Sequence, residues 1–282
     1  METGGVPIER IKLFQCGYCV NHLSHIVKHE RDKRLEFPAM VVLITHKKYG
    51  NVLFDTGYSK RIYQNGIISL IYNLLNPTHV KEADTIRYRL QQEGITAIDK
   101  IILSHAHPDH IGGLKDFQGY ELIATKEVWE SMEHIRISNL VFGNQVPHIN
   151  QKTQSRKTQA SGEGICKRVA QPTKNKHFLA DYFSEIYDLL GDGSIWGVRL
   201  DGHCKGQMGI YIGAFQLLFA ADSSWGSFFM ERAEQMRWIP RKIQADFDSY
   251  KETIQRIQKL QREHREIQVI FSHEPFEERT YE

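Results

Sequence analysis

The chain has 282 residues, of which 41% are hydrophobic and 25% are charged, with a formal net charge of +2. This composition is ordinary for a globular protein that buries a substantial core, and its charge predicts neither a nucleic-acid nor a membrane partner. No run approaches the roughly 18–20 apolar residues of a membrane span, and residues 1–7 lack the apolar core of a signal peptide. We therefore expect a cytoplasmic location.

The first half of the chain alternates strand and helix patterns. Short apolar runs predict strands at residues 11–14, 39–45, 52–54, 100–104 and 121–124. Tyr49-Gly50-Asn51 is expected to form the hairpin turn before the third of them. Helices are expected over 82–93, closed by Gly94, and over 126–134. Cys16 and Cys19 have the spacing of a redox or zinc motif, but no second pair follows, so we expect two small residues near the first strand.

The second half repeats this arrangement. Strands are expected at residues 194–200, 208–212, 216–221 and 268–272. Residues 246–266 predict a long amphipathic helix, because apolar residues recur at three- and four-residue spacing. Because the pattern of strands and helices occurs twice, it favours an α/β fold of the four-layer αββα sandwich type. We expect one domain over residues 1–282.

Two segments do not fit the bare sandwich. Residues 67–77 are too apolar for an exposed loop. They could form a helix that faces the core, or a lid or dimer contact that lines the entrance for the substrate. Residues 151–176 carry seven basic residues against the single acid Glu163 and have few apolar residues, so they predict a mobile insertion. Such a tract can bind a phosphate backbone, but a solvated loop explains it as well, and nucleic acid is not expected as a partner.

The most informative stretch is residues 104–110, Ser-His-Ala-His-Pro-Asp-His. Imidazole nitrogens and carboxylate oxygens are ligands that Zn²⁺ accepts well. The stretch follows an apolar strand and precedes a helix, at the sheet edge where open α/β sheets place their sites. Three further candidates each end an apolar run downstream: His203, Asp222 and His273. The pattern therefore indicates a metal site rather than a loop that is rich in histidine by chance.

In this order the residues resemble the metallo-β-lactamase superfamily of metallohydrolases, over about residues 8–273, and the resemblance implies the same αββα fold. It implies a dinuclear site with seven ligands: His105, His107 and His203 for the first ion, Asp109, His110 and His273 for the second, and Asp222 for both. Zinc is the first expectation for the two divalent ions, with iron, manganese or cobalt as alternatives. Asp55-Thr56-Gly57 resembles a further element of the superfamily, in which Asp55 orients a metal-bound histidine; a turn aspartate is the alternative.

The implied chemistry is hydrolysis. Two cations about 3.5–4 Å apart lower the pKa of a shared water to roughly 7, and the resulting hydroxide could attack a carbonyl or phosphoryl centre. Asp109 is the candidate that helps to move a proton to the leaving group. Relatives with diiron redox chemistry carry an acid at the position of His107, and antibiotic-cleaving relatives lack the bridging Asp222, so both activities are disfavoured.

Among the hydrolases the chain most resembles the N-acyl-homoserine lactonases, through residues 13–17, 54–58 and 187–194. Trp225 stands where these lactonases place a tyrosine that hydrogen-bonds the lactone carbonyl. Trp225 and Ile71 are the candidate substrate contacts. Cys204 follows His203 directly and is expected near the metal, although the superfamily does not use that position as a ligand.

Three functions stay open at this point. The first is a lactonase or carboxylic-ester hydrolase with an apolar acyl pocket and a small-molecule substrate. The second is a hydrolase of phosphodiester, phosphorylated or thioester substrates, which the basic segment favours through attraction to anions. The third is a regulatory protein that keeps the metal site without relevant turnover. A homodimer is left open in each case.

Overall fold

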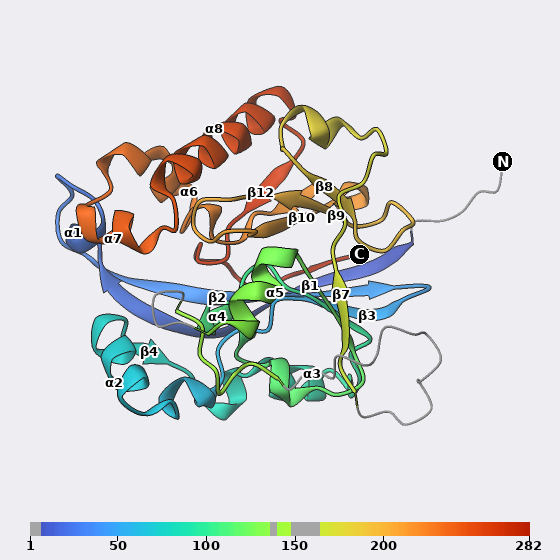
Figure 1. Cartoon of the computed structure of the whole chain (residues 1–282), viewed down its shortest axis with the longest axis horizontal. Helices are drawn as coiled ribbons and strands as arrows, with labels where there is room; N and C mark the ends of the chain where they lie inside the picture. The colour runs from blue at the N-terminus through green and yellow to red at the C-terminus, as the bar shows by residue number, and fades with distance from the viewer. Residues whose placement is uncertain (1–6, 136–139, 148–163) are drawn as a thin grey trace.

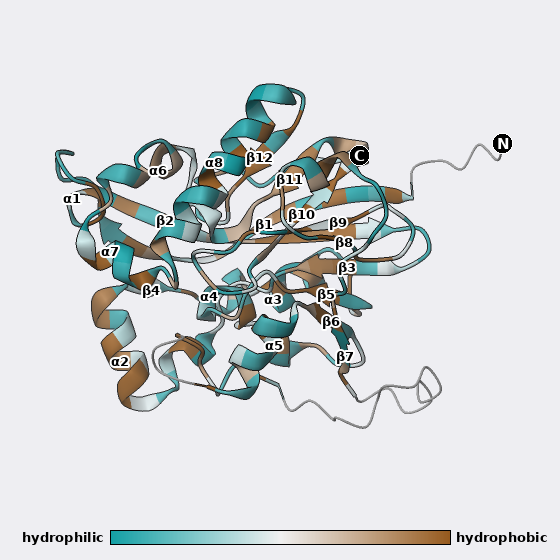
Figure 2. Cartoon of the chain, turned by 45° about the horizontal axis from the view of Figure 1, so that its top comes forward, coloured by the Kyte–Doolittle hydropathy of each residue, from teal (hydrophilic) through white to brown (hydrophobic). Residues whose placement is uncertain are grey.

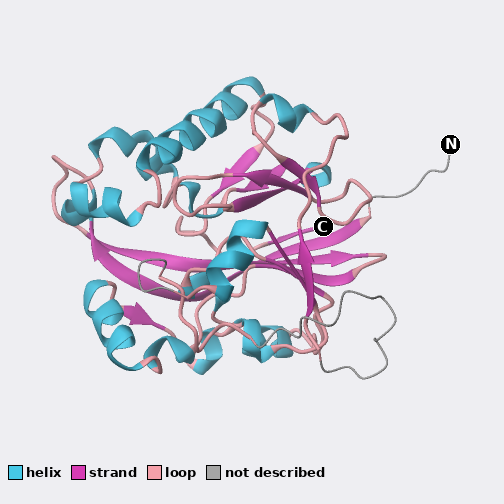
Figure 3. Ribbon diagram, viewed as in Figure 1, coloured by secondary structure: helices cyan, strands magenta, loops and turns pink. Residues whose placement is uncertain are grey.

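Two β-sheets pack face to face, and helices cover the outer face of each sheet (Figures 1 and 3). This arrangement comes from a computed structural model of the whole chain, which describes residues 7–135, 140–147 and 164–282. The predicted four-layer αββα sandwich is confirmed. Within the described residues no helix is long and apolar enough to cross a bilayer.

The larger sheet has the order β13-β1-β2-β3-β5-β6-β7, with β4 paired to β1 outside this path. Its strands are β1 (Ile8–His22), β2 (Arg34–His46), β3 (Gly50–Phe54), β4 (Thr78–His79), β5 (Lys100–Ile102), β6 (Glu121–Ala124), β7 (Cys166–Val169) and β13 (Thr280–Tyr281). The pairs from β13 to β3 are antiparallel, and the pairs from β3 to β7 are parallel. The carboxyl ends of β3, β5 and β6 therefore meet at one edge of the sheet.

The smaller sheet has the order β12-β11-β10-β9-β8. Its strands are β8 (Ile186–Asp188), β9 (Trp196–Arg199), β10 (Met208–Ile212), β11 (Leu217–Phe219) and β12 (Gln268–Ile270). Only β11 and β12 are parallel, and both end toward the same edge. The expected strands of both halves are present, and β1 is longer than expected.

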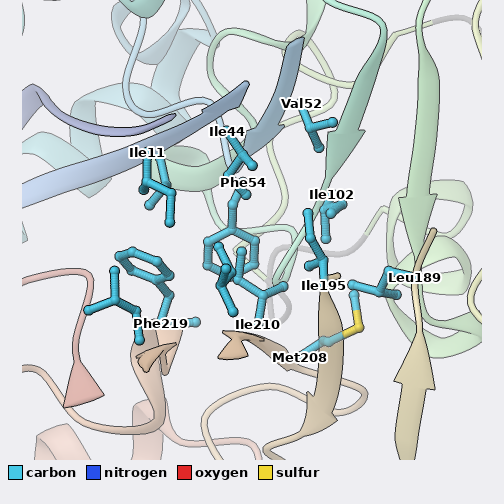
Figure 4. Close-up of a cluster of buried hydrophobic side chains, with 14 of the residues drawn as sticks. Ile11, Ile44, Val52, Phe54, Ile102, Leu189, Ile195, Met208, Ile210 and Phe219 are labelled. Atoms are coloured by element: carbon cyan, nitrogen blue, oxygen red, sulfur yellow. The ribbon is translucent and has the colours of Figure 1, made fainter. Parts of the chain in front are cut away.

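A buried apolar core lies between the sheets. Figure 4 shows its side chains pointing toward one another from the two sheets: Ile11, Ile44, Val52, Phe54, Ile102, Leu189, Ile195, Met208, Ile210 and Phe219. Strand β2 shows that both faces of the larger sheet are buried. Val42 and Ile44 face this core, whereas Val41 and Leu43 face a second core under α3 and α5, because successive side chains of a strand point to opposite faces.

The α-helices are α1 (Leu23–Ile26), α2 (Gly66–Leu75), α3 (Ile86–Gln92), α4 (Pro108–Ile111), α5 (Lys126–Glu133), α6 (Ser227–Glu231), α7 (Trp238–Ile243) and α8 (Phe247–Glu263). Short 3-10 turns are η1 (Lys60–Tyr63), η2 (Glu82–Asp84), η3 (Leu114–Asp116), η6 (Phe178–Asp181), η7 (Gly213–Phe215), η8 (Ala221–Ser223) and η9 (Ala233–Gln235). Helix α8 is the amphipathic helix expected from the sequence. Asp246 caps its first turn by accepting from the backbone N–H groups of Asp248 and Ser249.

The single helix predicted over 82–93 is wrong. Thr85 has extended backbone angles and separates η2 from α3, and its hydroxyl donates to the carbonyl of Glu82. A hydroxyl that bonds the backbone in this way competes with helical hydrogen bonding. Gly94 follows the end of α3 with a positive φ, as expected.

The two irregular segments have different outcomes. Residues 66–75 form α2, whose apolar side chains are mostly exposed, so the core-facing alternative is wrong. Residues 151–163 of the basic segment lie outside the described residues. Its later part is not a mobile insertion, because β7 pairs with β6 in the larger sheet. There Lys167 forms an ion pair with Glu133 and Arg168 forms one with Glu121, which accounts for two of its charges.

Candidate metal centre

The histidine-rich turn lies between β5 and α4. His105 and His107 are on the turn, and Pro108 occupies the first position of α4, where its fixed φ favours the helix. This places Asp109 and His110 in the first helical turn. All four side chains are buried.

The other three candidates come from the smaller sheet. His203 lies on the loop between β9 and β10, Asp222 lies in η8 directly after β11, and His273 follows β12. Because these strand ends meet the carboxyl ends of the larger sheet, the two sheets present their side chains to a common space. The structure brings together all seven residues that the sequence singled out.

The ligand-type atoms form two neighbouring groups. His105, His107, His203 and Cys204 form the first, and Asp109, His110, Asp222 and His273 form the second; within each group these atoms lie within 4.8 Å of one another. Asp222 lies between the groups. Its Oδ2 is 2.9 Å from His273 Nε2 and 3.5 Å from His203 Nε2. One carboxylate therefore reaches histidines of both groups.

A second layer of contacts orients the rings. Asp55 Oδ2 is 2.7 Å from His110 Nδ1, so the contact expected of Asp55 is present. Gln244 Oε1 is 2.8 Å from His203 Nδ1, and the carbonyl oxygen of Pro38 is 2.8 Å from His273 Nδ1. Acceptors at Nδ1 leave Nε2 free to bind a metal. No motif in the sequence contains Gln244 or Pro38, so neither contact was predicted.

His107 is oriented differently. Its Nδ1 lies 3.0 Å from His203 Nε2, whereas its Nε2 lies 3.3 Å from Cys204 Sγ. Cys204 is thus in direct contact with a candidate ligand, as its position after His203 suggested.

Three buried polar atoms of the cluster have no hydrogen-bond partner among the described residues: His105 Nε2, His110 Nε2 and Asp222 Oδ1. The last two lie 3.3 Å apart but not in hydrogen-bonding geometry. Buried polar atoms without partners are costly, and they are rare in folded proteins. Divalent cations would satisfy all three, and an imidazole and carboxylate donor set suits zinc, iron, manganese or cobalt. The residues therefore fit metal binding without selecting one metal.

The protonation states of the cluster follow from burial and charge. Burial, followed by neighbouring imidazoles, lowers the pKa of His105 and of His107 well below the ordinary histidine value. Burial also acts to lower the pKa of His273, but Asp222 and Asp109 outweigh it and raise this pKa to about 9. Burial acts to raise the pKa of Asp222, but His273 and His110 hold it well below its usual range. Metals bind deprotonated ligands, so a bound cation would take the place of protons here.

An apolar pocket of about 450 Å³ opens above the cluster. Five of the seven candidates are on its surface: His107, Asp109, His203, Asp222 and His273. Its walls include Phe37, Tyr58 and Tyr72. Burial, followed by the charge of Asp109, raises the pKa of both tyrosines well above the ordinary value, so their hydroxyls are protonated. These hydroxyls lie 3.1 Å apart.

The two candidate substrate contacts are placed differently. Trp225 lines the pocket, with its ring edge-on to those of Phe37 and His203. Ile71 is 52% exposed and is not among the pocket-lining residues. Its helix α2 contributes Tyr72 and Leu75 instead, since these lie three positions apart on one helical face.

Comparison with known proteins finds one matching family model. Residues 34–136 match the model of the metallo-beta-lactamase superfamily. The matched stretch contains the histidine-rich turn at residues 105–110. This confirms the superfamily that the histidine motif suggested, and none of the curated proteins matches the chain.

Solved structures extend the likeness in fold to nearly the whole chain. An N-acyl homoserine lactone hydrolase with N-hexanoyl-L-homoserine bound at its catalytic metal centre has a TM-score of 0.68 and 17% identity, over 95% of this chain and 94% of that one. A mutant of the AiiA protein of B. thuringiensis, with N-decanoyl-L-homoserine bound at its active site, also has a TM-score of 0.68 and 17% identity, over 95% of this chain and 94% of that one. A probable metal-dependent hydrolase from Staphylococcus aureus has a TM-score of 0.58 and 14% identity, over 97% and 91% of the two chains.

Gly202 has a structural role in placing His203. Its φ is +129°, and an added Cβ would lie 2.2 Å from the Cα of Tyr250 in α8. We expect Gly202→Ala to lower the free energy of unfolding by about 3 kcal/mol, because both the backbone angle and the packing oppose it. Urea unfolding measures this change.

Gly94→Ala is the matched control. Gly94 also has a positive φ, but nothing lies within 4 Å of an added Cβ. We expect Gly94→Ala to lower the free energy of unfolding by about 1 kcal/mol, from backbone strain alone. Equal losses for the two variants would contradict the packing role of Gly202.

Proposed function

We propose that this chain is a metal-dependent hydrolase that opens lactones or cleaves carboxylic esters with an apolar acyl group. The observation that carries the proposal is the apolar pocket whose floor is the histidine and carboxylate cluster. A small molecule bound there would lie with its apolar part against Phe37 and Trp225 and its polar end against the cluster. The likeness in fold to lactone hydrolases supports the same assignment.

Two divalent cations would be held as the family pattern implies, one in each group of ligand atoms, with Asp222 shared between them. Such cations make a water nucleophilic at neutral pH and polarise the substrate oxygen. The protein's own contribution is to hold the rings. Asp55, Gln244 and the Pro38 carbonyl fix three imidazoles through Nδ1, which keeps Nε2 directed into the cluster.

Asp109 is the residue proposed to move the proton. It lines the pocket, and its Oδ2 lies 3.3 Å from His273 Nε2 and 3.6 Å from His110 Nε2. The other carboxylate oxygen is then available to accept a proton from the attacking water and to pass it to the leaving alkoxide.

Tyr72 is the proposed hydrogen-bond donor to the substrate carbonyl. Trp225 occupies the place of the lactonase tyrosine and offers only an indole N–H. Tyr72 lines the pocket, and its hydroxyl stays protonated and lies 3.1 Å from that of Tyr58. If Tyr58 donates to Tyr72, then the Tyr72 hydroxyl proton is free for the substrate.

The pocket argues against the phosphate alternative. No lysine or arginine is among the described residues that line it. The basic residues Lys167 and Arg168, which favoured anions at the sequence level, pair with acids on α5 and β6 instead. An anionic substrate would therefore depend on the cations alone for charge compensation.

A substrate panel tests the assignment. The metal-loaded protein is incubated with N-acyl homoserine lactones of increasing acyl length and with a phosphodiester. We expect lactone hydrolysis with kcat/KM rising up to about fourfold per added methylene, because each buried CH₂ contributes about 0.8 kcal/mol. A faster phosphodiester reaction would favour the second hypothesis. Bound metal with no turnover of any substrate would favour the regulatory protein.

Metal analysis tests the ligand roles. We expect His107→Ala and Asp222→Asn each to lower the metal content per chain and to reduce turnover by at least about a hundredfold, since each removes a ligand. His134→Ala, which changes an exposed histidine at the end of α5, is the control. It should keep the metal content and the turnover of the parent. Full metal content in the Asp222 variant would refute its shared role.

Tyr72→Phe tests the proposed donor. Loss of one hydrogen bond to the developing oxyanion should reduce kcat by about tenfold to a hundredfold, with metal content unchanged. Tyr88→Phe, at an exposed tyrosine of α3, is the matched control. If both variants turn over lactone at the parent rate, Tyr72 is not the donor.

A further inference from the structure

Exposed apolar side chains gather on two helices. Of the twelve large apolar side chains that are exposed in the described chain, eight belong to α2 or α7: Ile67, Leu70, Ile71, Leu74, Leu75, Trp238, Ile239 and Ile243. Their exposed fractions run from 40% to 79%. Exposed apolar side chains that gather in this way are typical of an interaction site.

The two helices flank the mouth of the pocket. Leu75 of α2 and Ile239 and Ile243 of α7 line the pocket and are also 66%, 56% and 40% exposed. Figures 1 and 2 both show α2 and α7 at the same end of the molecule, and Figure 2 shows the apolar colouring of α2. We call α2 and α7 together the docking face.

Five cations surround the α7 side of this face: Lys28, Arg31, Lys33, Arg237 and Lys242. The segment that carries the first three lies beside α7, because Val27 bridges Met236 and Lys28 N–H donates to the Gln235 carbonyl. Among the described residues none of the five forms an ion pair with an acid.

Residues 28–33 and 237–243 contain two acids, Glu30 and Asp32. Glu30 pairs with Arg232, and Asp32 accepts from Ser24 and contacts His22. Helix α2 itself carries no charged residue. The border of the docking face is therefore basic, and its surface is apolar.

This charge distribution decides between two occupants. In a two-fold symmetric dimer the same face meets itself, which brings the cations of both copies to one interface. An anionic lipid surface instead offers phosphate and carboxylate groups to the cations and acyl chains to the leucines, isoleucines and Trp238. Tryptophan, aliphatic side chains and flanking lysine or arginine are typical of segments that lie in a membrane interface.

We propose that the docking face binds an anionic lipid surface, with the pocket mouth directed toward the bilayer. An amphiphilic substrate could then pass from the lipid into the pocket without its apolar part crossing water. The binding itself depends on neither the metal nor the hydrolysis, so it can be tested separately from the proposed function.

The fluorescence of Trp238 can report binding to a lipid surface. It is 71% exposed, whereas Trp129 and Trp196 are buried and Trp225 is partly buried. The full-length protein is mixed with vesicles of phosphatidylcholine alone or of phosphatidylcholine with phosphatidylserine, and sedimentation and tryptophan emission are recorded. We expect sedimentation and a blue-shifted emission with the anionic vesicles, both weakened by added salt.

The variant Leu70→Ser with Leu74→Ser removes two exposed side chains of α2, which are 66% and 79% exposed, so the fold should survive. We expect the partition coefficient onto anionic vesicles to fall by at least about tenfold. The control is Tyr88→Ser on α3, outside the docking face, which should bind as the parent does.

Three results would overturn the proposal. The first is equal partitioning of the α2 variant and the parent. The second is an emission spectrum that does not shift when the protein sediments. The third is absence of vesicle binding together with a dimer in gel filtration that the α2 variant dissociates, which would assign the docking face to a second copy. Failure of lactone hydrolysis with vesicle binding intact would count against the proposed function alone.

Discussion

The structure depends on one constraint: imidazoles and carboxylates that are buried close together must each have a partner for their charge or lone pair. Asp222 has histidines of both ligand groups within 3.5 Å, yet one of its oxygens has no hydrogen-bond partner among the described residues. A cluster of this kind is stable when cations complete it, because a buried charge without a partner is strongly unfavourable. Burial, helped by neighbouring imidazoles, lowers the pKa of His107, whereas at His273 the carboxylates of Asp222 and Asp109 outweigh burial and raise the pKa.

The sandwich supplies the rigidity that this cluster needs. Its candidate ligands come from turns that follow β5, β9, β11 and β12, and the apolar core between the sheets holds these strand ends at a fixed separation. Close backbone packing also positions the cluster. Gly202 lies against Tyr250 of α8, and this contact sets the position of the neighbouring His203. Contacts from Asp55, Gln244 and the Pro38 carbonyl then fix the ring orientations. Sites held on rigid elements and supported by such outer contacts are the ones that keep a productive geometry.

Polarity changes sharply from the cluster to the surface. The cluster is ionic, the pocket above it is apolar with two protonated tyrosine hydroxyls, and the mouth is bordered by the exposed apolar side chains of α2 and α7. One physical property, low polarity, thus connects the proposed acyl-binding wall with the proposed docking face. The same property disfavours a free anionic substrate, for which the described pocket wall supplies no basic side chain.

The sequence by itself indicated the αββα fold and the seven side chains that the structure brings together, because a strand followed by His-x-His-x-Asp-His and three later strand ends resembles a known superfamily. It also determined that Asp55 has a polar role beside a histidine. Only the tertiary structure decided which atoms meet: Gln244 with His203, Cys204 with His107, and Tyr72 rather than Ile71 on the pocket wall. It also decided that the apolar segment 66–75 faces outward and that β7 joins the larger sheet. Such contacts join residues that are far apart in the chain or depend on how a helix is rotated about its axis, and neither property is encoded in the local spacing of residue types.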